Sequence, residues 1–201
     1  MGSFEIPNQT YDIEDFMNKQ EVKNLIKKER ELYLNKANNL NIIKMWYTHE
    51  PIYEIWRFVY WLRKCEFYNK RKNIPSKIAL AYCRKKKNLY GMRMSIEIHE
   101  NCFGEGMLLY HGNIVVNSNA KIGKNARLHG GICIGNNGKS QLAPDIGNNV
   151  EIGYGAGIYG DVKINDGCKI GANAVVLRSS SGEKTVLLGI PAVERVNKDE
   201  S

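Results

Sequence analysis

Apolar residues recur every six positions along the second half of the chain. Ten of the eleven positions reached by stepping in sixes from Val116 hold Ile, Leu or Val, and only Ser140 departs: Val116, Ile122, Leu128, Ile134, Ser140, Ile146, Ile152, Ile158, Ile164, Ile170 and Val176. The residue after each is often Gly or Asn, which tolerate the backbone angles of tight turns. A hexapeptide period of short strands and turns is typical of a parallel β-helix.

Three hexapeptides, one for each side of a prism, make a coil of about 18 residues, so residues eighteen apart are expected to stack at the ~4.8 Å spacing of adjacent strands. This spacing predicts one internal column of Ile134, Ile152 and Ile170, and another of Leu128, Ile146 and Ile164. It also predicts that His111 and His129 share a column at an edge of the prism. The segment 138–145 interrupts the pattern without shifting its phase, and we expect it to project as a loop.

The first half of the chain has a helical period instead. From Tyr11 to about Lys87 we expect helices, with a mixed segment to Leu40. After Pro51 an apolar stripe follows helical spacing, and Pro75 is expected to open a further helix. The stripe consists of Ile52, Ile55, Trp56, Val59, Tyr60 and Leu62. These helices are expected to cap or flank the prism, which divides the chain into a helical region, 1–94, and a β-helix, 95–201.

Charge is uneven along the 201 residues. The formal net charge is +8, and the segment through Ser95 holds 19 Lys and Arg against 10 Asp and Glu. This basic region suits a phosphate-rich partner or an anionic membrane surface, although a solvated basic face is the more ordinary explanation. No nucleic-acid-binding motif accompanies the charge, so nucleic acid is not expected as a partner.

Targeting and cysteine patterns favour a cytoplasmic protein. The chain has no apolar run of the ~20 residues that a membrane span needs, and no signal-peptide pattern at its start. Its five cysteines are odd in number and widely spaced, which favours reduced thiols over disulfides or a zinc site. A single reactive cysteine stays open as an alternative.

From Ser95 to Val196 the chain resembles the hexapeptide-repeat acyltransferases, which fold as left-handed β-helices. The resemblance is carried by the stretches SIEIHENCFGEGMLLYHGNIVVNSNAKIGKNARL, ICIGNNGKS, IGANAVVL and LLGIPAVERV, and it is greatest to serine O-acetyltransferases and their relatives in surface-polysaccharide biosynthesis. It implies a homotrimer, with acetyl-CoA as acyl donor in a groove between neighbouring prisms.

The resemblance aligns the catalytic histidine of this family with His111 and its partnering acid with Glu97, where Asp is more usual. An imidazole can take the proton of a hydroxyl as that hydroxyl attacks a thioester, and a carboxylate on the other ring nitrogen stabilises the imidazolium. No metal is required. His129 is expected to position a substrate, to act as the base instead, or only to fill a polar edge; His49 and His99 have no such context.

The same alignment implies CoA contacts at a turn, at two edges of the coil and near the chain's end: Gly135, Asn136, Tyr154, Ala172 and Gly189, with Lys139 near a phosphate. Small side chains let a ligand approach the backbone closely. Tyr154 departs from the small residue usual at its position.

The acceptor is expected to be a sugar. Serine O-acetyltransferases carry an Arg-His pair before a proline in the projecting loop and an Asp before the catalytic histidine, whereas this chain has Leu142-Ala143-Pro144 and Tyr110. A carboxylate normally requires an Arg or an equivalent donor. We therefore expect transfer of acetyl to a hydroxyl of a surface or capsular polysaccharide or its precursor, near Tyr110 and at the inner membrane face. Serine O-acetylation is the alternative, and a non-catalytic trimeric scaffold is a second one.

Overall fold

The computed structural model describes residues 18–35 and 37–195, and the expected start of the helical region at Tyr11 lies outside them. Four helices come first: α1 (Lys19–Leu34), α2 (Asn39–Tyr47), α3 (Pro51–Asn69) and α4 (Ile74–Met94). Three of them begin at an asparagine whose side chain accepts a hydrogen bond from the first turn, and α3 begins at a proline whose missing N–H costs nothing there.

Fourteen short strands follow in the described part of the chain. Their bounds are β1 (Ile96–Glu97), β2 (Leu108–Leu109), β3 (Ile114–Val116), β4 (Lys121–Ile122), β5 (Arg127–Leu128), β6 (Ile132–Gly135), β7 (Asp145–Ile146), β8 (Glu151–Ile152), β9 (Gly157–Tyr159), β10 (Lys163–Ile164), β11 (Lys169–Ile170), β12 (Val175–Val176), β13 (Val186–Gly189) and β14 (Ala192–Arg195).

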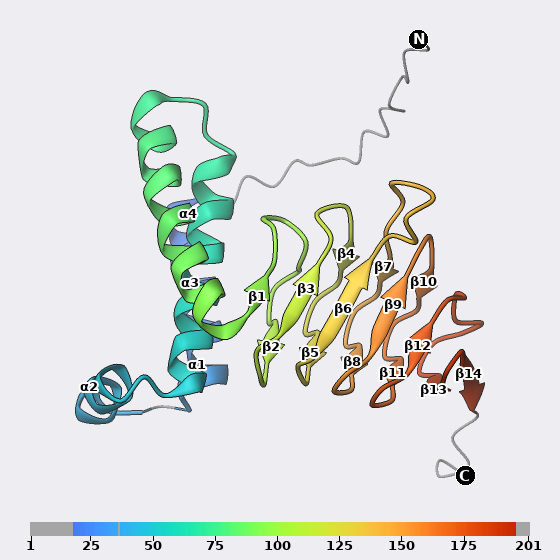
Figure 1. Cartoon of the computed structure of the whole chain (residues 1–201). Helices are drawn as coiled ribbons and strands as arrows, with labels where there is room; N and C mark the ends of the chain where they lie inside the picture. Colours follow the sequence, from blue (N-terminus) through green and yellow to red (C-terminus); the bar gives the residue numbers. More distant parts are fainter. Residues whose placement is uncertain (1–17, 36, 196–201) are drawn as a thin grey trace.

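The strands form the three faces of a parallel β-helix. The five-stranded face has the order β1-β3-β6-β9-β12, the three-stranded face β10-β7-β4, and the six-stranded face β14-β13-β11-β8-β5-β2. Every pairing is parallel except the last, between β13 and β14. Successive coils therefore stack along one axis, as Figure 1 shows.

The observed register differs from the predicted columns. Ile134 pairs with Ile158 across 24 residues, and Leu128 pairs with Ile152. The six extra residues lie in the loop between β6 and β7, so the chain reaches each later face six residues late while inward positions stay inward. The predicted stacking of Ile134 on Ile152, and of Leu128 on Ile146, is therefore wrong, although each of these residues is buried. Beyond the loop the predicted columns are confirmed, because Ile152 pairs with Ile170 and Ile146 with Ile164.

Two edges of the prism turn through residues in the left-handed conformation. Where the six-stranded face meets the five-stranded face, Asn113 and Asn173 have φ of 58° and 57°. Asparagine and glycine adopt this conformation at little cost, which explains why they punctuate the repeat.

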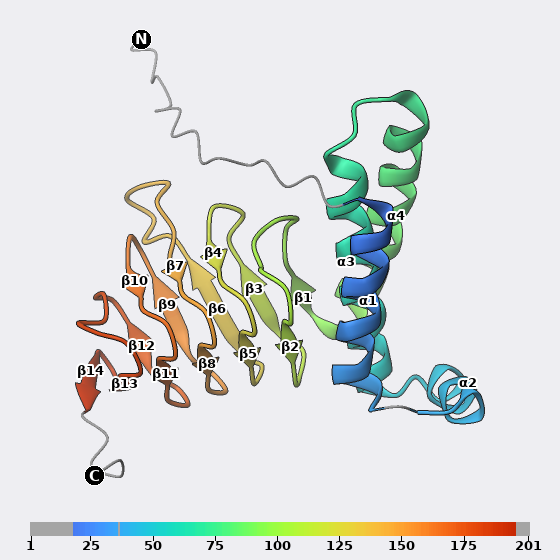
Figure 2. The same ribbon diagram turned by 180° about the vertical axis from the view of Figure 1, so that it is seen from behind.

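The helices cover the N-terminal end of the prism and share its core. Figures 1 and 2 show α1, α3 and α4 stacked against the first coil, with α2 standing apart from the strands. Phe58 and Leu62 of α3 belong to the same buried cluster as Met107 and Leu109 of the first coil. The expectation that the helices cap the prism is confirmed.

A network of buried charges joins this cap to the first coil. Arg63 of α3 donates to Glu29 of α1 at 2.7 Å and to Glu66 at 3.0 Å, and also to the carbonyl oxygens of Phe103 and Gly104 at 3.1 and 2.6 Å. Burial alone would lower the pKa of Arg63, but Glu66 and Glu29 outweigh it and hold that pKa above its usual range. The guanidinium therefore stays charged and fixes the first coil.

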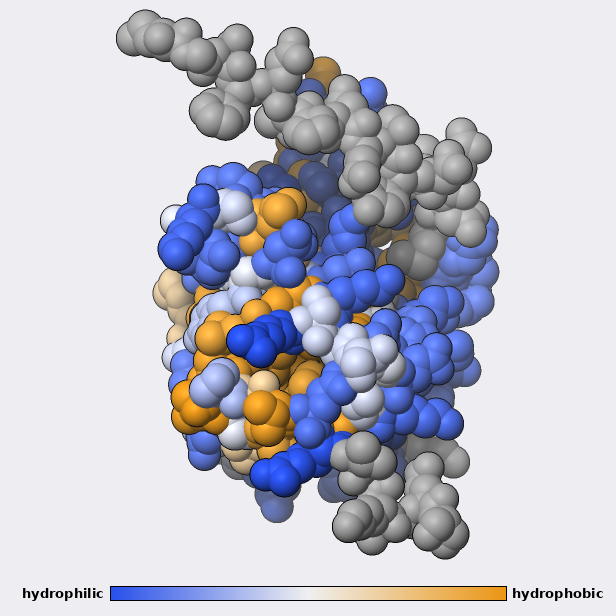
Figure 3. All heavy atoms as spheres, turned by 90° about the vertical axis from the view of Figure 1, so that its right-hand side faces the viewer, coloured by the Kyte–Doolittle hydropathy of each residue, from blue (hydrophilic) through white to orange (hydrophobic). Residues whose placement is uncertain are grey.

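The C-terminal end of the prism carries apolar side chains at its surface, as Figure 3 shows from that side. The exposed apolar residues of the last strands and their turns are Leu177, Leu188, Ile190 and Val193. Of the helices in the described residues, none is long and apolar enough to cross a membrane.

Candidate active site

The predicted site residues gather mainly at one edge of the prism, where the six-stranded face ends and the five-stranded face begins. We call this the histidine edge; its predicted members are Tyr110, His111, His129, Tyr154, Ala172 and Gly189. Backbone hydrogen bonds align its coils: Tyr110 N–H donates to the Leu128 carbonyl at 2.9 Å, and His129 N–H to the Ile152 carbonyl at 3.0 Å.

His111 stands exposed between β2 and β3. Gly130 lies directly beside it on the next coil: a Cβ atom at Gly130 would come within 2.7 Å of the His111 Cβ atom. Gly130 also has a φ of 101°, which favours glycine. The absence of a side chain at Gly130 therefore leaves room for the imidazole of His111 at the surface.

His129 has a different neighbour from the one that the eighteen-residue spacing predicts. Its ring stacks on Tyr110, with centroids 4.6 Å apart and planes inclined by 17°. The reason is one additional residue in this coil, because Leu109 pairs with Leu128 across 19 residues. The predicted column of His111 with His129 is wrong, although both remain at the same edge.

An acid that the sequence reasoning missed holds the His129 ring. Glu151 of β8 places its Oε1 atom 2.8 Å from His129 Nε2. On the six-stranded face Glu151 pairs with Arg127, 24 residues earlier in the chain. The contact could have been predicted only by allowing for the six residues that the loop adds to this coil. The stacked Tyr110 and the carboxylate of Glu151 together fix the plane of this imidazole.

Glu97, the predicted acid for His111, lies on the five-stranded face in β1, beside Val115. Its side chain is 72% exposed, and the nearest ionic partner of its carboxylate is His99, whose Nε2 atom lies 3.9 Å away. Among the described residues of one chain, no hydrogen bond or ion pair joins Glu97 to His111. The pairing of the two remains a prediction.

The predicted CoA contacts divide between both edges of the five-stranded face. Tyr154 belongs to the histidine edge, where its ring lies against Gly131: a Cβ atom there would be 3.2 Å from the ring. Gly135 ends β6 at the opposite edge, where Asn136 and Lys139 open the projecting loop. The Asn136 side chain accepts from Gly138 N–H at 3.2 Å, which shapes that turn.

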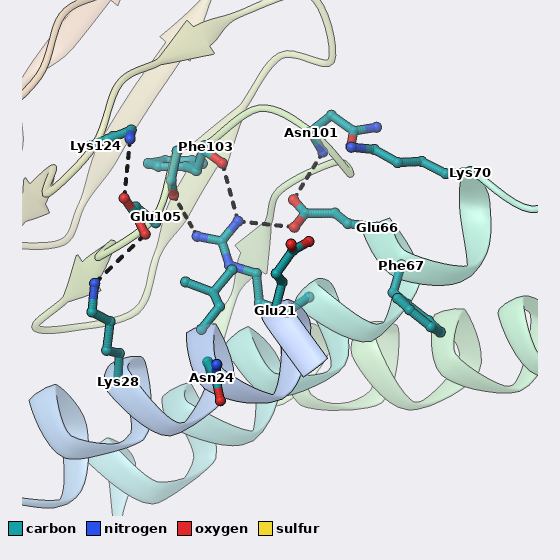
Figure 4. Close-up of a pocket in the computed structure, with 13 residues that line it drawn as sticks. Glu21, Asn24, Lys28, Glu66, Phe67, Lys70, Asn101, Phe103, Glu105 and Lys124 are labelled. Atoms are coloured by element: carbon teal, nitrogen blue, oxygen red, sulfur yellow. Dashed lines mark hydrogen bonds and ion pairs between the residues drawn. The ribbon is translucent and has the colours of Figure 1, made fainter. Parts of the chain in front are cut away.

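A cleft lies between the cap and the first coil and was not expected from the sequence. It has a volume of about 710 Å³. Figure 4 shows Glu66 directed at Asn101, whose N–H donates to it at 3.0 Å, while Lys28 and Lys124 both reach Glu105. Because these charged side chains pair with one another, their ion pairs link the helical cap to the first coil across the cleft.

Three of the five cysteines have thiols whose pKa is raised by burial: Cys65, Cys83 and Cys102. All five are free, and only Cys133 is not buried. Burial raises the pKa of Cys65 to about 12 and that of Cys102 to about 11. Within residues 18–35 and 37–195, no group of three or more His, Cys, Asp or Glu side chains could hold a metal ion.

Comparison with known proteins shows what this fold and edge resemble. Residues 143–178 match the family described as bacterial transferase hexapeptide (six repeats). The serine acetyltransferase of Staphylococcus aureus strain Mu50 is 32% identical over 148 residues, which are 72% of this chain and 64% of that protein. The chain therefore spans slightly less than two thirds of this relative. The serine acetyltransferase of Staphylococcus epidermidis is 40% identical over 100 residues, 48% of this chain and 46% of the relative.

Solved structures agree on the fold. Soybean serine acetyltransferase complexed with serine superposes with a TM-score of 0.64 at 26% identity, over 87% of this chain and 69% of its own. Serine acetyltransferase from Brucella abortus strain S19 in complex with coenzyme A gives a TM-score of 0.68 at 20% identity, over 88% of this chain and 68% of its own. The predicted left-handed β-helix with an N-terminal helical region is confirmed. In its six-residue repeat and in its fold, the chain resembles the hexapeptide-repeat transferases, whose repeats coil into a left-handed β-helix.

Proposed function

We propose that this protein is an acetyl-CoA-dependent O-acetyltransferase, that His111 is its general base, and that its acceptor is L-serine. The observation that carries the proposal is the exposed His111, kept accessible by Gly130, in a chain 32% identical to a serine acetyltransferase. This acceptor was the alternative in the sequence analysis; the relatives support it over the sugar.

The reaction needs one group that accepts a proton and later returns it. The imidazole of His111 takes the proton of the acceptor hydroxyl as its oxygen attacks the thioester carbonyl. The resulting tetrahedral intermediate loses CoA when its carbon–sulfur bond breaks, and the imidazolium returns the proton to the leaving thiolate. The products are an acetate ester and free CoA, and no covalent bond to the enzyme forms.

Acetyl-CoA fits the two edges of the five-stranded face better than either edge alone. The predicted contacts Gly135, Asn136 and Lys139 lie at one edge, and Tyr154, Ala172 and Gly189 at the other. We propose that the protein is a homotrimer in which the groove between neighbouring prisms brings opposite edges of two chains together. This arrangement also allows Glu97 of a neighbouring chain to serve as the acid.

The sugar alternative loses part of its support in the structure. A Tyr110 ring free on both faces would suit stacking on a sugar, but His129 covers one of those faces at a centroid distance of 4.6 Å. An L-serine acceptor requires no contact with a membrane, so association of the basic helical region with the inner membrane face is not part of this proposal. A cytoplasmic location remains our proposal, because acetyl-CoA is the donor.

An acceptor panel tests the proposal. CoA release from acetyl-CoA is measured as free thiol for the native protein with L-serine, nucleotide sugars and capsular glycan fragments, and the product is identified by its mass. We expect release with L-serine and formation of O-acetylserine. Release only with a sugar would reinstate the polysaccharide function, and no release with any acceptor would support the scaffold.

A further inference from the structure

A buried carboxylate lies between a histidine and an arginine side chain beside the histidine edge. Glu54 of α3 has a side chain only 5% exposed. Its Oε1 atom lies 2.8 Å from His49 Nδ1, and its Oε2 atom accepts from Arg93 Nη1 at 3.1 Å. The three residues and Met94 line a hollow of about 310 Å³. His49 comes from the turn between α2 and α3, and Arg93 from the last turn of α4.

This cluster adjoins the backbone that carries His111. The N–H of Asn113 donates to the Met94 carbonyl oxygen at 2.9 Å. A Cβ atom on Gly112 would collide with the same carbonyl, so the two backbones are in contact there. Arg93 directly precedes Met94, and His111 directly precedes Gly112. The contact between Met94 and Gly112 therefore brings the backbones of Arg93 and His111 close together.

Glu54 engages one nitrogen of each neighbour, Nδ1 of His49 and Nη1 of Arg93. When the imidazole is neutral and its Nδ1 donates to Glu54, His49 Nε2 is an acceptor, so the further donor of the cluster is Arg93 Nη2. Arg93 Nη2 donates to no residue that the structure describes. Because Glu54 is already paired with Arg93, an incoming anion would not meet an uncompensated negative charge. A guanidinium held in place by a buried carboxylate is a well-oriented donor to a second carboxylate.

We propose that Arg93 binds the α-carboxylate of the amino-acid acceptor, with Glu54 as the positioning residue that orients its guanidinium. The inference rests on the proposed function, since it identifies how the acceptor of that reaction is held. It also accounts for the projecting loop, where Leu142 and Ala143 stand in place of the expected Arg-His pair. The arginine is supplied here by the helical cap instead of the loop.

The test compares acceptors with and without a carboxylate. KM and kcat are measured for L-serine, for ethanolamine, which lacks the carboxylate, and for acetyl-CoA. The variants are Arg93→Gln and Arg93→Lys. The control is Arg84→Gln, because Arg84 lies on the same helix, is 46% exposed against 44% for Arg93, and also pairs with a glutamate, Glu100, at 3.2 Å.

For Arg93→Gln we expect the KM of L-serine to rise about 10- to 100-fold, the usual effect of losing a charged hydrogen bond, with the KM values of ethanolamine and acetyl-CoA unchanged. Arg93→Lys keeps a cation beside the buried Glu54, and so guards against misfolding; we expect a smaller rise, again for L-serine alone. Arg84→Gln should match the native protein.

Two results would overturn the inference in distinguishable ways. If the native protein uses L-serine but both Arg93 variants keep the native KM for it, or change L-serine and ethanolamine equally, the carboxylate is bound elsewhere and the proposed function still stands. If the native protein itself shows no serine-dependent thiol release, the inference and the serine acceptor fail together.

Discussion

Replacing Arg63 with methionine would remove the central cation of the cap junction. The side chain donates three hydrogen bonds to Glu29, one to Glu66, and one each to the carbonyls of Phe103 and Gly104. Both glutamates are buried and would lose their only guanidinium partner. Methionine fills much of the same volume, so lost charge pairing is the main effect of the change.

The expected cost follows from the burial of those carboxylates. Removing one member of a buried ion pair typically destabilises a protein by about 3–5 kcal/mol, because the remaining charge is left without compensation. That is a large share of the ~5–15 kcal/mol by which a domain is stable. In the double variant Arg63→Met/Glu29→Met one orphaned carboxylate disappears, so part of the loss should return. The recovery is incomplete because Gly106 N–H, which donates to Glu29 at 3.0 Å, loses its acceptor.

The assay is urea unfolding followed by circular dichroism, at one fixed protomer concentration because association shifts apparent stability. Arg84→Gln is the matched control, since Arg84 is 46% exposed and Glu100 keeps Lys87 as a second cation at 3.3 Å, so the loss should be about 0–1 kcal/mol. A cost below about 1 kcal/mol for Arg63→Met, or one equal to that of Arg84→Gln, would refute the assignment of this network as the fastening between cap and prism.

Two further substitutions test other parts of the account. Gly130→Ala should lower the free energy of unfolding by about 1–3 kcal/mol and slow thiol release, because it strains a φ of 101° and places a methyl group 2.7 Å from the His111 Cβ atom. Gly182 lies in open space, so Gly182→Ala should change neither quantity. Equal effects of the two substitutions would contradict the role of Gly130 in making room for His111. For Glu100, burial opposes ionisation, but Arg84 and Lys87 hold the pKa of its carboxyl below its ordinary value. The ionised Glu100 therefore stabilises the fold fully at pH values above its ordinary pKa, and this stabilisation is lost as the pH falls through its lowered pKa in the folded protein. The difference in free energy of unfolding between the native protein and Glu100→Gln, measured by urea unfolding from pH 7 to pH 3, should therefore shrink as the pH falls. An advantage that stays constant or grows would contradict it.

The sequence predicts the prism because burial selects every inward position directly. Ile122, Ile146 and Ile164 are apolar since each points into the core, and the period follows from that alone. The loop between β6 and β7 defeats the prediction of columns for the same reason. An insertion of six residues keeps the phase of the pattern, so the repeat alone does not show that every later strand lies one face behind the position that an uninterrupted repeat would give it.

The details of the histidine edge depend on smaller irregularities. A single additional residue between Leu109 and Leu128 exchanges the stacking partner of His129 from His111 to Tyr110. The contact of His129 with Glu151 joins two coils on either side of the loop. It could be predicted only from the observed strand register. The sequence thus identified the residues of this edge but not their pairing.

The cap was predictable in outline only. Helical periodicity indicated an apolar stripe on α3, and residues of that stripe do pack on the prism. A buried Arg63 reads as one more surface charge in a basic segment, because its partner Glu29 lies 34 residues away in another helix. The same holds for Arg93 and Glu54, which only the packing of α3 against α4 brings together.

The most direct test of the account is CoA release from acetyl-CoA in the presence of L-serine, compared between the native protein, His111→Ala and His99→Ala. His99 is an exposed histidine of the same β-helix outside the histidine edge, so its variant controls for the general effect of losing an imidazole. We expect His111→Ala to reduce kcat by about 10²–10⁴-fold, the contribution of a general base, and His99→Ala to retain native activity. Native kcat in the His111→Ala protein would show that the base lies elsewhere and would contradict the central claim.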